Sequence, residues 1–295
     1  MSCAMNSQRR SDKVEGSLSI QLESDSIMPH LRVRDLEIYY EIHGSGPRLF
    51  FIGGSGGDLR EKPNIFDGPL TKHFEVLSYD QRGLGRTDVP PGPYTMADYA
   101  EDAAALLRAL EFTPCLLMGV SFGGMVAQEL LCRAPDVSEI ARRAVLACTS
   151  AGGEAGASYP LHELASLSNR DRAIRMIEIS DTRYDEAWRE ANPDQAEAFI
   201  KVASMRGRAV DDDSDRGRKL QLEARSHHDT SDRLGKVSIP VYLCAGRRDG
   251  IAPPSNQHAL AAALPKATLD FFDGGHLFLM QDRSAYKKIV SFLLE

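Results

Sequence analysis

A single serine lies among small residues where an apolar run gives way to a helical pattern. The segment reads Gly119-Val120-Ser121-Phe122-Gly123, preceded by CLLM and followed by GMVAQEL. It fits the pattern G-x-S-x-G on a strand–turn–helix, in which a sharp turn exposes the middle side chain at the end of a sheet. Small residues two positions away avoid a clash, and the hydroxyl would lie over a helix N-terminus. The segment therefore predicts that Ser121 is a nucleophile.

A serine hydroxyl is a weak nucleophile that needs a general base, and the base needs an orienting group. After this kind of turn the partners follow in the order serine, acid, histidine. Among eight histidines, His276 follows the last predicted strand on the glycine-containing loop FFDGGHLFL, from which it could reach back to the serine. Asp249 follows the preceding strand on the loop RRDGIAPP. We predict His276 as the base and Asp249 as the acid, with Asp273 left open as an alternative acid.

Acyl transfer also requires donors for the oxyanion that forms on the attacked carbonyl. One expected donor is the backbone N–H of Phe122, the residue after the nucleophile. The other is expected from the loop GGSGG (53–57), whose glycines let the backbone approach a substrate. This loop fits neither G-x-x-x-x-G-K-[ST] nor G-x-G-x-x-G followed by an acidic residue about 20 positions on. No nucleotide or other cofactor is therefore expected.

Two further segments contain groups that could bind ligands. The turn DQRGLGRTD (80–88) contains charged residues next to the third predicted strand, and we interpret it as structural. SHHD (226–229) could hold a metal but is better explained as the end of a helix, and no H-E-x-x-H or comparable ligand cluster is present. No metal is expected.

The elements that must position these residues follow from hydrophobic patterning. Short apolar runs occur at 36–44, 48–54, 74–80, 115–120, 143–148, 241–246 and 267–274. Several are nearly continuous, which indicates strands buried on both faces. Helical patterns alternate with them at 95–111, 122–135, 255–265 and 282–295. This alternation predicts an α/β fold with a mostly parallel central sheet and helices on both faces.

The alternation is interrupted between about 151 and 232, where helical patterns occur without a strand-like run. We interpret 151–232 as a helical cap inserted into an α/β core formed by 29–150 and 233–295. Residues 1–28 are polar and unpatterned, which predicts a disordered N-terminal extension. Trp188, the only tryptophan, lies in the predicted cap, where it could line a substrate pocket or pack against the core.

The composition of the chain argues against nucleic-acid and membrane partners. The chain has 295 residues and a net charge of −7, with no basic stripe, so a nucleic-acid partner is not expected. No run approaches 18 apolar residues, and the N-terminus lacks the apolar segment of a secretory signal. The five cysteines form no C-x-x-C pair. We expect a reduced, cytoplasmic chain that acts on a small molecule without a membrane partner, and composition does not indicate an oligomeric state.

Five segments in order, GGSGG, DQRGLGRTD, GVSFGG, AGRRDGIAPP and GGHLFLMQD, together resemble the α/β-hydrolase superfamily. The resemblance covers residues from about 31 to 295. It implies a triad of Ser121, His276 and Asp249 beneath a helical cap.

Within the superfamily, PPGPYTMADYAEDAAALLRAL and GVSFGGMVAQEL are similar to the 3-oxoadipate enol-lactonases. Alignment of FIGGSGGDLR with the oxyanion segment of those enzymes implies Ser55 as the second oxyanion donor and Gly54 as a substrate contact. Those enzymes carry Asn-Ser where this chain has Gly53-Gly54. The resemblance therefore supports the triad more strongly than it supports a lactone as the substrate.

The resulting prediction is a cofactor-independent serine hydrolase that cleaves an ester, lactone or thioester through an acyl-enzyme. Carbon–carbon bond hydrolases, perhydrolases and peptidases of the same fold are left open. A small-molecule receptor that retains a triad is the alternative from a different functional class.

Overall fold

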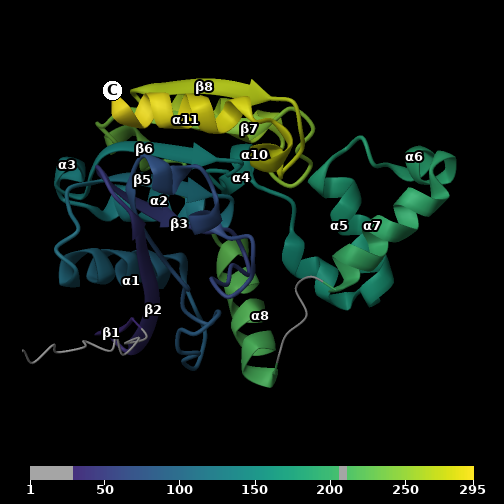
Figure 1. The fold of residues 1–295 in the computed structure, drawn as a ribbon, viewed down its shortest axis with the longest axis horizontal. Coiled ribbons are helices and arrows are strands. Elements are labelled where there is room, and N and C mark those ends of the chain that lie inside the picture. The colour runs from purple at the N-terminus through teal and green to yellow at the C-terminus, as the bar shows by residue number, and fades with distance from the viewer. Residues whose placement is uncertain (1–28, 206–210) are drawn as a thin grey trace, which may run out of the picture.

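The computed structural model describes residues 29–205 and 211–295, so the predicted extension over 1–28 lies outside the described residues. An eight-stranded sheet forms its centre, in the order β1-β2-β4-β3-β5-β6-β7-β8 (Figure 1). The strands are β1 (His30–Val33), β2 (Leu36–Gly44), β3 (Arg48–Ile52), β4 (Glu75–Tyr79), β5 (Cys115–Val120), β6 (Ala141–Ala147), β7 (Val241–Gly246) and β8 (Ala267–Phe272).

The sheet confirms the predicted mostly parallel arrangement. Strand β2 runs antiparallel to β1 and β4, and all pairs from β4 to β8 are parallel. Every residue of β7 is buried, as the continuous apolar run VYLCAG predicts for a strand covered on both faces. Strand β1 was not predicted, because its four residues, HLRV, are too few to show a pattern.

Helices cover both faces of the sheet. Helices α1 (Met96–Ala109), α2 (Phe122–Arg133) and α9 (Pro254–Ala263) pack into one core cluster, and α11 (Ser284–Leu294) packs into a second. Helix α1 begins with a capping box: Thr95 Oγ1 accepts from the Asp98 N–H, and Asp98 Oδ2 accepts from the Thr95 N–H. Short helices that the sequence did not indicate are α3 (Val137–Ile140) and α10 (Phe278–Gln281).

The segment between β6 and β7 is helical, as predicted. Its elements are α4 (Gly153–Gly156), the 3₁₀ helix η3 (Leu161–Ser166), α5 (Asn169–Ser180), α6 (Glu186–Ala191), α7 (Pro193–Met205) and α8 (Asp212–Ser226). Helices α5, α6 and α7 project beyond one end of the sheet, whereas α8 lies closer to the core (Figure 1). The two ends of the segment meet, because Thr230 N–H donates to Ala151 O at 2.8 Å and Gly152 pairs with Asp229.

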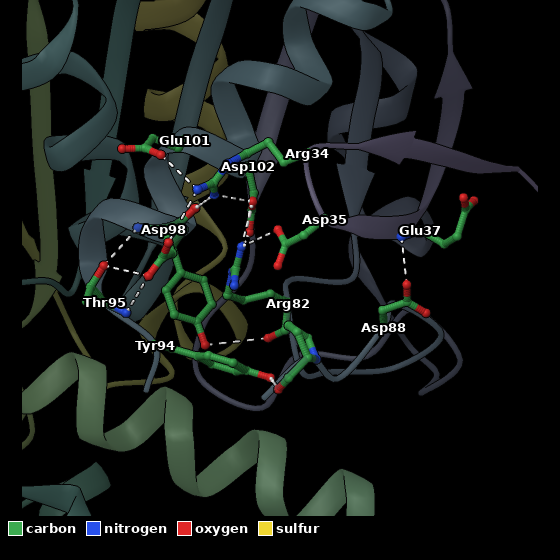
Figure 2. Close-up of polar contacts among 12 residues, drawn as sticks. Arg34, Asp35, Glu37, Arg82, Asp88, Tyr94, Thr95, Asp98, Glu101 and Asp102 are labelled. Carbon is green, nitrogen blue, oxygen red and sulfur yellow. Dashed lines mark hydrogen bonds and ion pairs between the residues drawn. The ribbon is translucent and has the colours of Figure 1, made fainter. Parts of the chain in front are cut away.

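The turn after β4 is tied to α1 by a buried ion pair (Figure 2). Arg82 Nε and Nη2 donate to the two oxygens of Asp102 at 2.6 and 2.9 Å. Arg34 Nη1 donates to the same carboxylate at 2.7 Å. Asp80 accepts from the N–H groups of Leu59 and Arg86 within the same region. These contacts favour a structural role for the segment DQRGLGRTD.

The buried side chain of His228 predicts an acid-sensitive fold. Its Nε2 donates to Ser150 O at 3.2 Å, since a carbonyl can only accept. Burial lowers the pKa of His228 to about 4. Between pH 6.5 and 4 the unfolded chain therefore binds a proton that the folded chain does not, and stability should fall as the pH falls. Denaturant titrations at pH 7 and pH 5 should show that the contribution of His228 lowers the free energy of unfolding by about 2 kcal/mol at the lower pH.

A matched variant isolates this contribution from other titrating groups. Burial raises the pKa of Asp80 to about 6, which acts in the opposite direction but is common to both proteins. The variant His228→Gln keeps an N–H donor for Ser150 and cannot titrate. Its loss of stability on acidification should be smaller than that of the wild type. Equal losses in the two proteins would show that His228 does not cause the effect.

Candidate active site

Ser121 lies on the sharp turn that the sequence pattern requires. It joins β5 to α2 with φ 55° and ψ −117°, a strained conformation for a residue with a side chain. A Cβ atom at Gly119 would overlap the carbonyl group of Gly123, and one at Gly123 would overlap the carbonyl group of Ile52. The two flanking positions therefore accept only glycine, and the turn presents the serine hydroxyl at the carboxyl end of the parallel strands.

The structure brings the three predicted side chains into one hydrogen-bonded chain. His276 Nε2 lies 2.9 Å from Ser121 Oγ, and His276 Nδ1 lies 2.8 Å from Asp249 Oδ2. Since a carboxylate can only accept, Nδ1 carries the proton of the neutral ring, and Nε2 can take a proton from the serine. The side chain of Asp249 is fully buried, and that of His276 is 12% exposed. Two hydrogen bonds thus connect the hydroxyl of Ser121, through the His276 ring, to the buried carboxylate of Asp249.

Asp249 is held by its own loop, whereas Asp273 is engaged elsewhere. The second oxygen of Asp249 accepts from the N–H groups of Ile251 and Ala252 at 2.8 and 2.9 Å. Asp273 Oδ1 instead lies 3.3 Å from Arg183 Nη1, and its side chain is 81% exposed. The geometry therefore favours Asp249 as the partner of His276, and the alternative acid Asp273 is not in contact with the histidine ring.

A thiol lies beside this chain of residues. The ligand atoms of Cys148, Asp249 and His276 all lie within 4.8 Å of one another. Burial, with Asp249 nearby, holds the pKa of the Cys148 thiol well above its usual value. A neutral thiol is a poor nucleophile and a poor metal ligand, which favours Ser121 over Cys148 as the reactive group.

The glycine loop after β3 borders the serine. A Cβ atom at Gly54 would lie 3.6 Å from Ser121 Cβ, and Gly57 N–H closes a turn on Gly54 O at 3.2 Å. Within the described parts of the chain, the N–H groups of Ser55 and Phe122 have no hydrogen-bond acceptor. Both donors are therefore available to a ligand oxygen, although the roles of Ser55, Phe122 and Gly54 stay predictions.

Gln221 of α8 is a site-supporting residue that sequence reasoning missed. Its Oε1 accepts from the N–H of Gly56 at 2.8 Å, and its side chain is buried. The two residues are 165 positions apart, so no local pattern relates them. The contact fixes the glycine loop against the helical insertion.

Trp188 lies within an aromatic cluster formed by α6, α7 and the turn before α6. Its ring stacks on Phe199 at 5.6 Å between centroids and meets the edge of Tyr184 at 4.7 Å. Helix α6 lies at the far end of the insertion from the sheet (Figure 1). The contacts of Trp188 indicate packing inside the insertion, and its assignment to the substrate pocket stays a prediction.

The fold and the site together define the class of protein. A mostly parallel sheet carries a serine on a strand–turn–helix, with an acid and a histidine on loops after later strands, which is the arrangement of an α/β-hydrolase. The model of the alpha/beta hydrolase fold family matches residues 47–282. The chain belongs to this family and is a hydrolase. Among its described helices, none is long and apolar enough to cross a bilayer.

Several known proteins are similar over most of the chain. A poly(3-hydroxyalkanoate) depolymerase of Ectopseudomonas oleovorans is 29% identical over 249 residues, which cover 84% of each chain. The 3-oxoadipate enol-lactonase 2 of Acinetobacter baylyi is 24% identical and covers 90% of this chain and 96% of its own. The crystal structure of the enol-lactonase from Burkholderia xenovorans superposes with a TM-score of 0.71 at 24% identity, covering 90% of this chain and 100% of that one.

Proposed function

We propose that the protein is a serine hydrolase that cleaves an ester, lactone or thioester of a small acyl compound. Ser121 is the nucleophile, His276 the general base and acid, and Asp249 the orienting carboxylate. The observation that carries the proposal is the continuous hydrogen-bonded chain from Asp249 through His276 to Ser121 Oγ. No cofactor takes part in the reaction.

The proposed reaction has two halves. As Ser121 Oγ attacks the substrate carbonyl, its proton moves to His276 Nε2, and Asp249 stabilises the imidazolium. The bond to the leaving group then breaks, and His276 returns the proton to the leaving oxygen or sulfur. A water molecule, deprotonated by His276, attacks the acyl-enzyme. The acyl–Oγ bond breaks, the acid is released, and Ser121 regains its proton.

The charge that develops on the carbonyl oxygen needs donors during both halves. We assign this role to the backbone N–H groups of Ser55 and Phe122. The loss of one such donor typically costs about 3 kcal/mol of transition-state stabilisation. Gln221, which holds the neighbouring N–H of Gly56, supports the geometry of this loop.

The named substrates of two relatives favour an oxygen ester over the other acyl substrates. The names of the depolymerase and the enol-lactonase, to which the chain is similar, both describe substrates with such a bond. We assign residues 151–232 as the cap that shapes the pocket, since α8 of this segment contacts the glycine loop. Acyl specificity then depends on the cap rather than on the triad.

A labelling experiment combined with a substrate panel tests the proposed class. A fluorophosphonate probe should label the folded wild type at Ser121, because only an activated serine reacts with it. Steady-state rates on p-nitrophenyl esters of increasing acyl length, small lactones and thioesters should show turnover of at least one ester or lactone. A folded wild type that is neither labelled nor active on any member of the panel would refute the proposed hydrolase.

A further inference from the structure

The C-terminal end of α5 meets both loops that carry the triad. Ser180 O accepts from the N–H of His276 itself at 2.6 Å. Ile179 O accepts from Gly250 N–H, and Thr182 N–H donates to Arg248 O, each at 2.9 Å. Three backbone hydrogen bonds therefore join one short segment of the insertion to residues next to Asp249 and to the catalytic histidine.

A side-chain bridge between the exposed residue Gln281 and the buried residue Asp181 reinforces this junction. Gln281, from α10, donates through Nε2 to Asp181 Oδ2 at 3.0 Å. Its Oε1 accepts from the N–H of Gly275 at 2.8 Å. Gly275 immediately precedes His276, and a Cβ atom there would overlap the carbonyl group of Ser180. The bridge thus runs from the end of α5, through one amide side chain, to the backbone that sets the position of the histidine.

Asp181 supplies a fixed charge to this bridge. Arg183 Nε and Nη2 donate to its two oxygens at 2.9 and 2.7 Å. Burial would raise the pKa of Asp181, but the hydrogen bonds from Arg183, together with the Gln281 contact, hold the pKa below its usual value. Because Asp181 stays ionised, both of its oxygens accept, and the amide of Gln281 has one orientation that satisfies both of its contacts.

We propose that Gln281 and Asp181 are positioning residues for His276, so that the end of α5 forms part of the catalytic apparatus. The proposal rests on the serine hydrolase function proposed above. The loop before His276 contains two glycines, Gly274 and Gly275, and gains little rigidity from its own backbone. The bridge supplies that rigidity from outside the loop and keeps Nε2 within reach of Ser121.

The variant Gln281→Met tests the bridge, because it keeps a similar shape and removes both polar contacts. We expect kcat on the best ester of the panel to fall on the order of 10- to 100-fold with KM unchanged, since a displaced base costs rate rather than ground-state binding. Gln195→Met is the matched control: it makes the same exchange at an exposed position of α7 and should leave kcat unchanged. Circular dichroism should show both variants folded.

Two further measurements separate positioning from general stability. The proton on His276 Nδ1, hydrogen-bonded to Asp249, should give a downfield ¹H NMR signal that broadens or disappears in Gln281→Met and persists in Gln195→Met. Asp181→Asn alone should lower kcat. The double variant Asp181→Asn/Gln281→Met should have the same kcat as Gln281→Met, since both changes break the same bridge. The proposal is overturned if Gln281→Met keeps wild-type kcat and the NMR signal, or if the two changes are additive. The signal needs no substrate, so its loss supports the bridge even if the panel refutes the hydrolase.

Discussion

Replacing Ser121 with alanine is expected to lower kcat on an activated ester by about 10⁴- to 10⁶-fold without changing the fold. The change removes the hydroxyl oxygen that lies 2.9 Å from His276 Nε2. The neighbouring Cys148 cannot replace it, because its buried thiol is neutral. Fluorophosphonate labelling should disappear together with the rate. Steady-state kinetics and intact-protein mass spectrometry on the purified variant measure both effects.

The proposed triad predicts that the effects of its single substitutions on kcat are not additive. His276→Ala should lose nearly as much activity as Ser121→Ala, and the double variant should lose little more than either, because the groups act as a unit. Residual catalysis would then come from the oxyanion donors and substrate binding. If Ser121→Ala retained more than about 1% of wild-type kcat, well above the residual rate expected for a lost nucleophile, the assignment of Ser121 would be wrong.

The largest effect on stability is expected at Asp102. Its side chain is 1% exposed and receives hydrogen bonds from Arg82, which is 4% exposed, and from Arg34 (Figure 2). Asp102→Asn keeps the shape of the side chain but leaves the buried Arg82 charge with only the more distant, exposed carboxylate of Asp35, 3.4 Å from Nη2. Breaking such a pair typically costs about 3–5 kcal/mol, a large part of the stability of a protein. Urea titration followed by circular dichroism should show a midpoint shifted to a much lower concentration.

Glu101 provides the matched control on the same helix. It contacts Arg34 at 2.8 Å, but its side chain is 50% exposed, so water can replace the carboxylate. Glu101→Gln should therefore cost less than about 1 kcal/mol. If Asp102→Asn and Glu101→Gln lowered the free energy of unfolding by similar amounts, burial would not be the reason why the Arg82–Asp102 pair stabilises the fold. In the double variant Arg82→Met/Asp102→Leu, part of the lost stability should return, because apolar residues can replace a buried pair.

Much of the architecture could be predicted because its signals are local. Apolar runs such as VYLCAG identify strands buried on both faces, and Gly119 and Gly123 identify the turn that exposes Ser121. The carboxyl ends of parallel strands share one edge of the sheet. Residues that follow three such strands, Ser121, Asp249 and His276, are therefore close in space although far apart in sequence. Strand β1 escaped prediction because four residues cannot show a period.

The sequence by itself determined the fold class, the insertion between β6 and β7, and the proposed nucleophile and base, Ser121 and His276, because periodicity and turn chemistry act over a few residues. Only the tertiary structure decided which carboxylate meets His276, since Asp249 and Asp273 both follow strands. The contacts of Gln221 with the glycine loop, of Gln281 with Asp181, and of Arg82 with Asp102 were also seen only in the tertiary structure. Each pair joins elements that the packing of the whole chain brings together. Such contacts depend on the distance and direction between two side chains, which no spacing along a single segment encodes.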